Sequence, residues 1–565
     1  MTSDIQQSRA QISTAAIQRL HIAMRHLFIR GSYKPLGVSG EAMIEAMLML
    51  RPEIYGSIAD PERVELNGLH YIFQRLPQGI EECRFIKLIS REGFENSKFP
   101  AIIPSKRRRN CYRIDEEQMF IEMTRGRSDI YDVMTHLTFM YIEAEKIRHN
   151  SLDSKNRKKR DWKMLKLIVE QDMRGEKINT EVAYTYLSTI LGRTYDDTVE
   201  AAEKFAKTSK VNNLFRIAYW LGQRSIEEYV DKNDREMSFS SALREKLGHH
   251  IYGELWANNV KKFLFEKGLL NRPIHIISAN QHSVMNSFFA KAALARKVKF
   301  KNLEDLASQL SLKKNDKLRD TVKKYALKNG MYELDDATGT NISVQIFDTA
   351  AIDCSKLPPE ILGKRKKLKS NCIIVVMDYA FGEQAFETMD ELLKPYDHID
   401  EKIPMPVQSV NIMGKAGILI GEKGDIMIPT AHVFEGTADN YPFENDLEID
   451  AFKNKGLNVV QGPMITVLGT SLQNKDILRY FLKSSWGAVG LEMEGAHYQK
   501  AIQAAAKIRK GIRSDVKLRY AYYASDNPLE TGSTLASGAL GLDGVKPTYM
   551  ITVEILKKIL LTIDG

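Results

Sequence analysis

Two acidic side chains stand where a buried strand is predicted to give way to a helix. The apolar run "WGAVGLEM" is followed by the helical pattern "EGAHYQKAIQAAAKI", which puts Glu492 and Glu494 at the mouth of the strand. An unpaired charge in such a place is costly. Each carboxylate therefore needs a partner, which either the protein or a ligand supplies.

Polar residues also follow other predicted strands. Since ligands of open α/β sheets bind beyond the carboxyl ends of the strands, we expect these residues to contribute to one site. They are Asn280, Gln281 and His282 after "PIHIIS", the "GKAG" turn at 414–417, and Ser525 and Asp526 after "LRYAYYA".

Each of these positions also has a plain structural interpretation. Gly414 and Gly417 could bring backbone N–H groups against an anion, as glycine-rich turns do, or could form an ordinary turn. Lys415 could meet a phosphate or point to solvent. Asp526 could act as an acid, or could cap the turn before Asn527-Pro528.

The elements that would position these residues begin near residue 270. From Pro273 onward, apolar runs such as "NCIIVVMD" and "KLRYAYYASD" alternate with helical patterns. This alternation predicts an α/β domain over 270–565, with a mixed, mostly parallel sheet flanked by helices. Before it, apolar residues at intervals of three and four predict a mostly helical region over 1–269. The prolines and basic cluster of 98–114 predict a loop there.

Length and composition limit the possible classes of protein. A chain of 565 residues is expected to form two or three domains. The net charge of +9 suits an anionic metabolite as well as a nucleic acid. The basic runs at 105–110, 155–160 and 363–369 are interpreted as solvated loops. The four cysteines lack CxxC spacing, so neither a zinc site nor a disulfide framework is indicated. The sequence shows no signal peptide and no membrane-spanning segment, and we therefore expect a cytoplasmic protein.

The order of motifs in the second half resembles the nucleoside phosphorylase and nucleosidase superfamily. "NIMGKAGILIGEKGDIMIPTAHVF", "GPMITVLGTSLQN", "GLEMEGAHY" and "YYASDNPLETG" stand in the order of the family's glycine-rich strand end, base-pocket strand, Glu-Met-Glu element and Ser-Asp element. The last piece is most similar to AMP nucleosidases, which also carry an extra N-terminal domain. The resemblance covers about 272–565.

The resemblance implies a role for each motif residue. Asp526, supported by Ser525, would protonate the leaving purine, a role that needs burial or a neighbouring carboxylate because a free Asp has a pKa of about 3.9. Glu494 would accept hydrogen bonds from both ribose hydroxyls, or would be an acid at a helix N-terminus stabilised by the helix dipole, a role compatible with ribose binding. Met493 would pack on the sugar, and Glu492 would hold the site or be paired structurally. The resemblance also places phosphate at the "GKAG" turn, where Lys415 would meet it. It implies self-association, and neither a cofactor nor a metal.

Two departures from the family pattern keep the reaction open. Methylthioadenosine nucleosidases carry a water-activating glutamate after the first strand, whereas this chain has "SANQHSVMN". Here His282 would act as the base, or Gln281 and Asn280 would only orient water or phosphate. Glu383 is interpreted as a helix-start residue. The strand "GPMITVLG" lacks an aromatic residue for stacking a purine.

The leading hypothesis is hydrolysis of the N-glycosidic bond of a purine nucleotide or nucleoside, as in AMP nucleosidase. A phosphate-dependent purine nucleoside phosphorylase is the nearest alternative. A non-catalytic nucleotide sensor is another. Nucleic-acid binding is the weakest alternative, because the basic runs lack interleaved aromatic residues.

Overall fold

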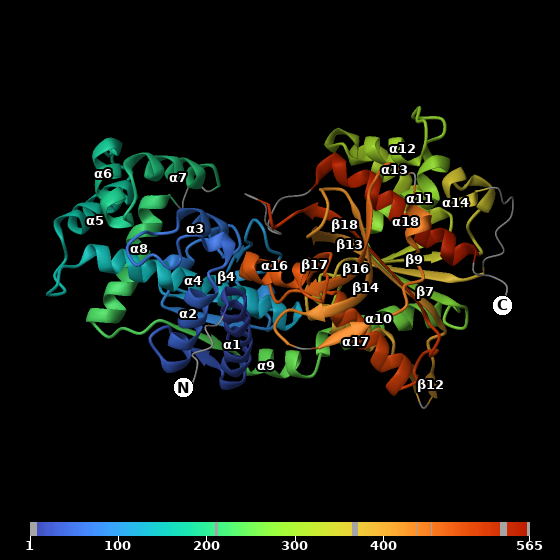
Figure 1. Cartoon of the computed structure of the whole chain (residues 1–565), viewed down its shortest axis with the longest axis horizontal. Helices are drawn as coiled ribbons and strands as arrows, with labels where there is room; N and C mark the ends of the chain where they lie inside the picture. The colour runs from blue at the N-terminus through green and yellow to red at the C-terminus, as the bar shows by residue number, and fades with distance from the viewer. Residues whose placement is uncertain are drawn as a thin grey trace. The chain divides into compact units, whose positions relative to one another are not determined.

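The computed structural model divides the chain into two compact units (Figure 1). Unit 1 comprises Met1–His249 and Ser471–Ile477, and unit 2 comprises His250–Thr470 and Leu478–Gly565. Unit 2 thus begins before residue 270, the boundary expected from the sequence. The structure describes residues 8–208, 213–363, 371–399, 401–437, 439–453, 455–530 and 540–561.

Unit 1 combines helices with a sheet that the sequence analysis missed. The sheet has six strands in the order β1 (Ser32–Tyr33), β6 (Glu236–Phe239), β2 (Phe85–Ile89), β5 (Gln118–Glu122), β4 (Cys111–Arg113) and β3 (Ala101–Ile102). Its helices are α1 (Arg9–Arg30), α2 (Val38–Leu50), α3 (Leu66–Phe73), α4 (Gly126–Ser151), α5 (Arg160–Met173), α6 (Thr180–Leu191), α7 (Tyr195–Thr208), α8 (Leu214–Val230) and α9 (Ser241–Gly248). The predicted loop at 98–114 is therefore wrong in part, because it contains β3 and β4.

One basic run of unit 1 is not the solvated loop that was expected. The guanidinium of Arg109 is buried and lies 2.8 Å from the Asp129 carboxylate, with Asp132 also in contact. Arg107 forms a second ion pair with Asp132 at 2.8 Å. Ser105, Lys106 and Arg108 of the same run are exposed. The run at 155–160 is exposed as expected, whereas 364–369 lies outside the described residues.

A short segment from the second half of the chain belongs to unit 1. Within Ser471–Ile477, the side chain of Asn474 donates a 2.7 Å hydrogen bond to the carbonyl of Leu50. The carbonyl of Gln473 accepts one of 2.9 Å from the N–H of Glu53. Helix α16 (Lys475–Lys483) begins in this segment and continues into unit 2.

Unit 2 is built on a ten-stranded sheet. Its path runs β15 (Asn440–Pro442), β14 (Ile426–Phe434), β16 (Val459–Thr466), β17 (Gly490–Glu492), β13 (Val407–Ile418), β7 (Ile274–Ser278), β10 (Ile373–Met377), β9 (Val344–Asp348) and β8 (Met331–Leu334), and β18 (Lys517–Asp526) pairs with β13 and β14. A separate hairpin joins β11 (Tyr396–His398) to β12 (Glu401–Ile403). The predicted mixed sheet is confirmed. "Mostly parallel" is wrong, because antiparallel pairings are as numerous as parallel ones among the described strands.

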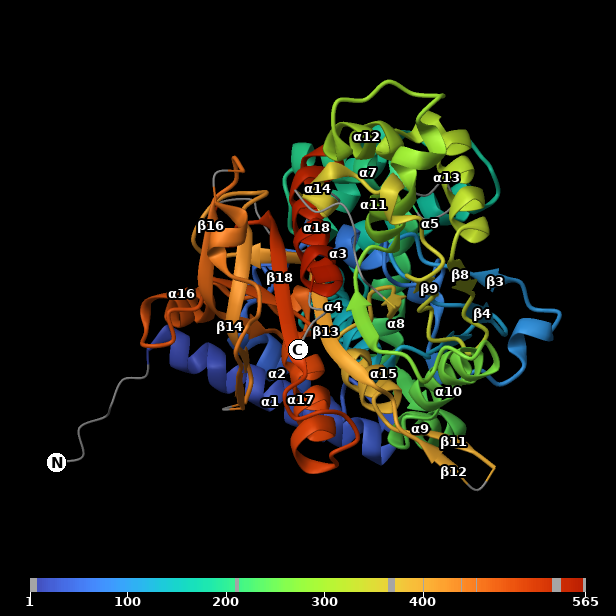
Figure 2. The same cartoon turned by 90° about the vertical axis from the view of Figure 1, so that its right-hand side faces the viewer.

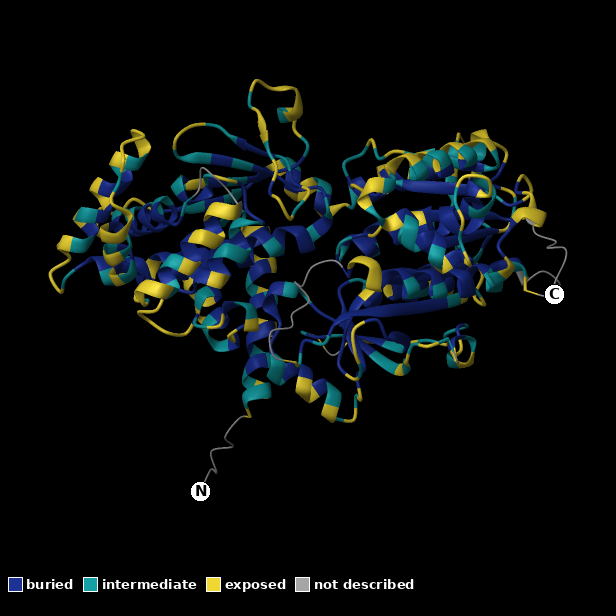
Figure 3. Cartoon of the chain, turned by 90° about the horizontal axis from the view of Figure 1, so that it is seen from above, coloured by how far each residue is buried: buried dark blue, intermediate teal, exposed yellow. Residues whose placement is uncertain are grey.

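Helices cover both faces of this sheet (Figure 2). One apolar layer joins the strands to α11 (Gln281–Leu294), α12 (Leu303–Ser311), α13 (Asp316–Lys328), α14 (Pro359–Leu362) and α18 (Val545–Leu561). The other joins them to α10 (Ile251–Glu266), α15 (Gln384–Leu392) and α17 (Gly495–Gln503). The strands between the two layers are largely buried, as the dark blue ribbons of Figure 3 show. Continuous apolar strands such as β7 and β10 are typical of a sheet buried on both faces.

Five strands of the sheet close into a ring. β13 pairs with β18, β18 with β14, β14 with β16, β16 with β17, and β17 again with β13. Strand β13 belongs to the ring and to the open sheet because its first half pairs with β7. The "GKAG" sequence at 414–417 lies inside β13, so the predicted turn is wrong. Two glycines close together had suggested a turn, but both are paired with β18, with a shift of register between Ala416 and Gly417.

Candidate functional site at the edge of β13

The site lies where β13 leaves the open sheet. Ile412 is the last β13 residue paired with β7, opposite Ser278, and Gly417 is the first paired with β17, opposite Leu491. Along residues 413–416 this edge of β13 has no partner strand in the described part of the chain. Such a break in sheet topology is where α/β proteins bind their ligands.

Strands β17 and β18 flank Gly417 from its two sides. Leu491 on β17 and Asp526 on β18 are both paired with this glycine. The Glu-Met-Glu element and the Ser-Asp element, 32 residues apart in the sequence, therefore meet at one position of β13. The sequence analysis predicted that residues of these two elements contribute to one site, and this stays a prediction for their side chains.

Glu492 is held by the protein. It is buried, and its Oε1 accepts a 2.5 Å hydrogen bond from the hydroxyl of Thr466 on β16. Its Oε2 accepts from the backbone N–H groups of Glu494 (2.5 Å) and Gly495, at the start of α17. Burial, and secondarily the charge of Glu494, raise the pKa of Glu492 to about 8. Glu492 therefore has the structural role that the sequence analysis gave as one alternative: it fixes the junction between β17 and α17.

Glu494 occupies the N-cap position of α17 but makes no capping hydrogen bond with its side chain. Its Oε1 instead accepts a 3.0 Å hydrogen bond from the N–H of Gly382, in the loop that follows β10. The side chain is therefore directed toward the carboxyl end of β10. The hydroxyls of Tyr498 on α17 and Ser278 at the end of β7 are 3.0 Å apart. This hydrogen bond holds α17 against the carboxyl end of β7, the strand next to β10. Met493, between the two glutamates, is buried.

Ser525 and Asp526 end β18 inside the protein. The Ser525 hydroxyl donates a 2.5 Å hydrogen bond to Oδ1 of Asp526 and lies 3.1 Å from the carbonyl oxygen of Ala416. Only 5% of the surface of Asp526 is exposed. The turn that follows is capped by Asn527, whose Oδ1 accepts from the N–H of Leu529 at 3.0 Å. The alternative role of Asp526 as the cap of this turn is thus filled by its neighbour.

A pocket of about 520 Å³ opens beside β13. Lys415 lines it from β13, and Asn280 and His282 line it from the end of β7 and the start of α11. Two further cations line the pocket, Lys313 just before α13 and Arg319 within α13. The sequence analysis did not single them out. Desolvation of the imidazole by the surrounding protein lowers the pKa of His282, and the positive charge of Arg319 lowers it further. The pocket is therefore cationic and suits an anionic group such as phosphate.

Other residues that the sequence analysis considered for the site do not line this pocket. The Gln281 amide donates a 2.7 Å hydrogen bond to the carbonyl of Ser343 and accepts one from the Ser343 hydroxyl at 3.1 Å, so it connects α11 to the residue that precedes β9. Glu383 is the N-cap residue of α15, which confirms its predicted place at a helix start. Glu494 and Asp526 are not among the residues that line the pocket of Lys415.

Tyr379 is a site residue that sequence reasoning missed. It follows β10, and its ring lies so close to Gly414 that a Cβ on this glycine would be 3.5 Å from it. Its hydroxyl is hydrogen-bonded to Tyr523 and to the backbone of Asn280, both of which line the cationic pocket. Loss of solvent around the hydroxyl, followed by the effect of Tyr523, raises its pKa well above the usual range. An aromatic residue after a strand carries no sequence signal that would distinguish it from a packing residue.

Comparison with known proteins gives three kinds of result. No curated protein matches the chain. Among solved structures, a methylthioadenosine/S-adenosylhomocysteine nucleosidase of Campylobacter jejuni is 12% identical, with 51% of this chain and 98% of that chain covered and a TM-score of 0.30. Futalosine hydrolase of Helicobacter pylori is 12% identical (50% and 97% covered, TM-score 0.29), and uridine phosphorylase isoform 2 of Schistosoma mansoni is 14% identical (53% and 93% covered, TM-score 0.30).

Similarities at this identity and TM-score carry no argument about the function of this chain. A protein-family model gives the third result. It matches residues 41–307 and 299–561, which together span most of both units. The chain therefore belongs to a family of unknown function, DUF6909.

Proposed function

We propose that this protein hydrolyses the N-glycosidic bond of a purine nucleotide, in the manner of an AMP nucleosidase. The observation that carries the proposal is the pairing of Gly417 with both Leu491 and Asp526. It brings the two acidic motifs to the same level of β13, next to the open edge formed by residues 413–416. A nucleoside bound at that edge would have one motif on each side.

The residue types suit this reaction. Cleavage breaks the bond between C1′ of the ribose and a purine nitrogen, and the transition state resembles an oxocarbenium ion. Asp526 would give a proton to the departing base, and Ser525 holds its carboxyl group in place through the 2.5 Å hydrogen bond. Glu494 would accept hydrogen bonds from the ribose hydroxyls, and Met493 would pack against the sugar. Water then supplies the hydroxyl that C1′ gains, and its remaining proton restores the acid.

The cationic pocket favours a substrate that carries a 5′-phosphate. Lys415, Lys313 and Arg319 line it together, and charge-assisted hydrogen bonds from such groups to phosphate are among the strong ones. Arg319 is already paired with Asp316, so the two lysines are the donors proposed for the phosphate. Lys415 comes from the same stretch of β13 as Gly417. His282, whose pKa is lowered, is neutral at pH 7 and is the residue of this pocket that could accept a proton from water.

The same pocket favours one alternative function. If it holds inorganic phosphate instead of a phosphate ester, phosphate would attack C1′ and the protein would be a purine nucleoside phosphorylase. Hydrolysis and phosphorolysis then differ only in the nucleophile.

Release of the free base decides between these functions. The full chain is incubated with AMP, adenosine, inosine or methylthioadenosine, with and without phosphate, and the base is quantified by chromatography. We expect adenine from AMP without added phosphate, and its loss in Asp526→Asn. Strict dependence on phosphate would assign the phosphorylase. Tight AMP binding in calorimetry without any base release would indicate the nucleotide sensor and contradict both enzymes.

A further inference from the structure

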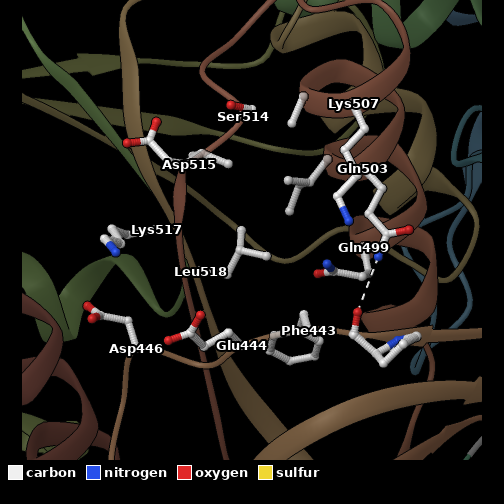
Figure 4. Close-up of a pocket in the computed structure, with 14 residues that line it drawn as sticks. Phe443, Glu444, Asp446, Gln499, Gln503, Lys507, Ser514, Asp515, Lys517 and Leu518 are labelled. Carbon is white, nitrogen blue, oxygen red and sulfur yellow. Dashed lines mark hydrogen bonds between the residues drawn. The ribbon is translucent and has the colours of Figure 1, made fainter.

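A second cavity of unit 2 lies at the opposite ends of the elements that carry the acidic motifs. It has a volume of about 320 Å³ (Figure 4). Its walls come from the second half of α17, from residues 442–446, and from residues 514–518 at the start of β18. Asp526 ends β18 and Glu494 precedes α17, so the cavity is separated from both along these two elements.

The amide of Gln499 is the unusual feature of this cavity. The residue is only 1% exposed, and its Oε1 is buried with no hydrogen-bond partner among the described residues. Figure 4 shows the amide directed away from α17, into the space between Phe443 and Leu518. A buried polar group without a partner is costly, and most buried polar groups in native proteins have one. The partner of Gln499 is therefore expected to enter the cavity from outside the protein.

The backbone around Gln499 is also irregular. Helix α17 ends at Gln503 and continues as a π-helical turn over Ala504–Ile508. Ala506 and Lys507 of this turn line the cavity. Single π-turns in helices occur frequently at functional sites.

The remaining wall residues limit the chemistry of an occupant. Around the amide the wall is apolar, with Ile502, Phe443, Val516 and Leu518. Charged residues of both signs also line the cavity. Asp446 and Asp515 are already paired with arginines, at 2.6 Å and 2.5 Å. The cavity thus offers the buried Gln499 amide together with apolar side chains, while Glu444, Lys507 and Lys517 are charged residues of the same wall.

We propose that this cavity binds an uncharged heterocyclic base through the amide of Gln499. A glutamine amide pairs with adjacent donor and acceptor atoms, the pattern that adenine presents along one edge. The flat faces of a base suit the apolar walls and the Phe443 ring. Because the cavity touches both α17 and β18, an occupant could influence the positions of Glu494 and Asp526. The binding itself does not depend on the function proposed above.

Calorimetry on the full chain with adenine, hypoxanthine and uracil as probes tests the proposal. We expect at least one probe to bind with a Kd of about 1 mM or tighter. Gln499→Leu should weaken that binding by about tenfold, the effect of one lost hydrogen bond. The same substitution at Gln461, which is exposed on β16, is the matched control and should leave binding within about twofold.

Two further variants separate this cavity from the site at β13. Binding that survives Asp526→Asn and Glu494→Gln but is lost in Gln499→Leu supports the proposal, even if the protein proves to have no hydrolase activity. Binding lost in the first two variants and kept in the third would place the base at the β13 site and overturn it. Absence of binding by all three probes would do the same, and so would AMP binding through Gln499 more than about tenfold tighter than adenine.

The thermal stability of Gln499→Leu gives an independent check on folding. Because the leucine removes an unpartnered buried amide, the variant should unfold at the same temperature as the wild type or higher. Probe at a concentration that saturates the wild type should raise the melting temperature of the wild type more than that of the variant. A variant that melts well below the wild type would show that Gln499 has a partner within the protein, and would contradict the proposal.

Discussion

The carboxylate of Glu494 accepts a 3.0 Å hydrogen bond from the backbone N–H of Gly382. This contact crosses from the first turn of α17 to the loop after β10, two elements that are 112 residues apart in the sequence. It sets the direction of the carboxylate before any ligand arrives. Preorganised acceptors of this kind lose little freedom when a substrate binds.

Glu494→Gln should therefore lower kcat/KM for AMP by about 100-fold, because about 3 kcal/mol of charge-assisted hydrogen bonding to the ribose is lost. The glutamine oxygen can still accept from Gly382, so the fold is retained. The comparison with 2′-deoxy-AMP identifies the ribose as the partner. The wild type should discriminate strongly against the deoxy substrate and the variant should not. Equal discrimination by both proteins would contradict ribose binding by Glu494.

Asp526→Asn should abolish base release, by a factor of about 1,000, because an amide cannot protonate the leaving base. Its neighbour Asn527 provides the control, since it caps the following turn through Leu529. Asn527→Ala should cost about 1 kcal/mol of unfolding free energy and change kcat by less than about threefold. Activity assays and urea titrations of both variants separate the two roles. Similar activity losses in both variants would mean that Asp526 acts only through the local structure.

The pKa of Glu492 predicts a specific dependence of stability on pH. The folded protein holds this proton up to about pH 8, whereas the unfolded chain releases it near 4.5. Between these values the folded state binds more protons, so the unfolding free energy should fall as pH rises, by up to about 1.4 kcal/mol per pH unit from this group. Glu492→Gln should flatten the decline between pH 5 and 8. Urea unfolding at several pH values measures this, and parallel curves for the two proteins would refute the assignment.

Much of the second half could be predicted from the sequence, whereas less of the first half could. Buried strands such as β7 and β10 carry long apolar runs, and the acidic motifs of β17 and β18 stand in a recognisable order. The strands of unit 1 are two to five residues long, too short for an alternating pattern to be distinguished from the surrounding helices. Lys313 and Arg319 were missed because only the three-dimensional path of the chain brings them to Lys415.

The cationic pocket predicts a preference for 5′-phosphorylated substrates. Lys415→Ala should raise the KM for AMP by about tenfold and leave that for adenosine unchanged, because only AMP carries the phosphate. Lys423→Ala is the matched control, since Lys423 is an exposed lysine paired with Asp543 at 3.0 Å outside the residues that line the pocket. Steady-state kinetics with both substrates test this. An equal rise in KM for AMP and adenosine would place Lys415 away from the phosphate.

The basic run of unit 1 predicts opposite outcomes for two adjacent arginines. Arg109 is buried, and its guanidinium contacts both Asp129 and Asp132. Truncation to alanine would leave two buried carboxylates with one fewer partner, so Arg109→Ala should cost about 3–5 kcal/mol of unfolding free energy. Arg108 is exposed, and Arg108→Ala should change stability by less than about 0.5 kcal/mol. Chemical denaturation followed by far-ultraviolet circular dichroism compares them. If both variants unfolded at the same denaturant concentration, the run would be the solvated loop that its composition suggests.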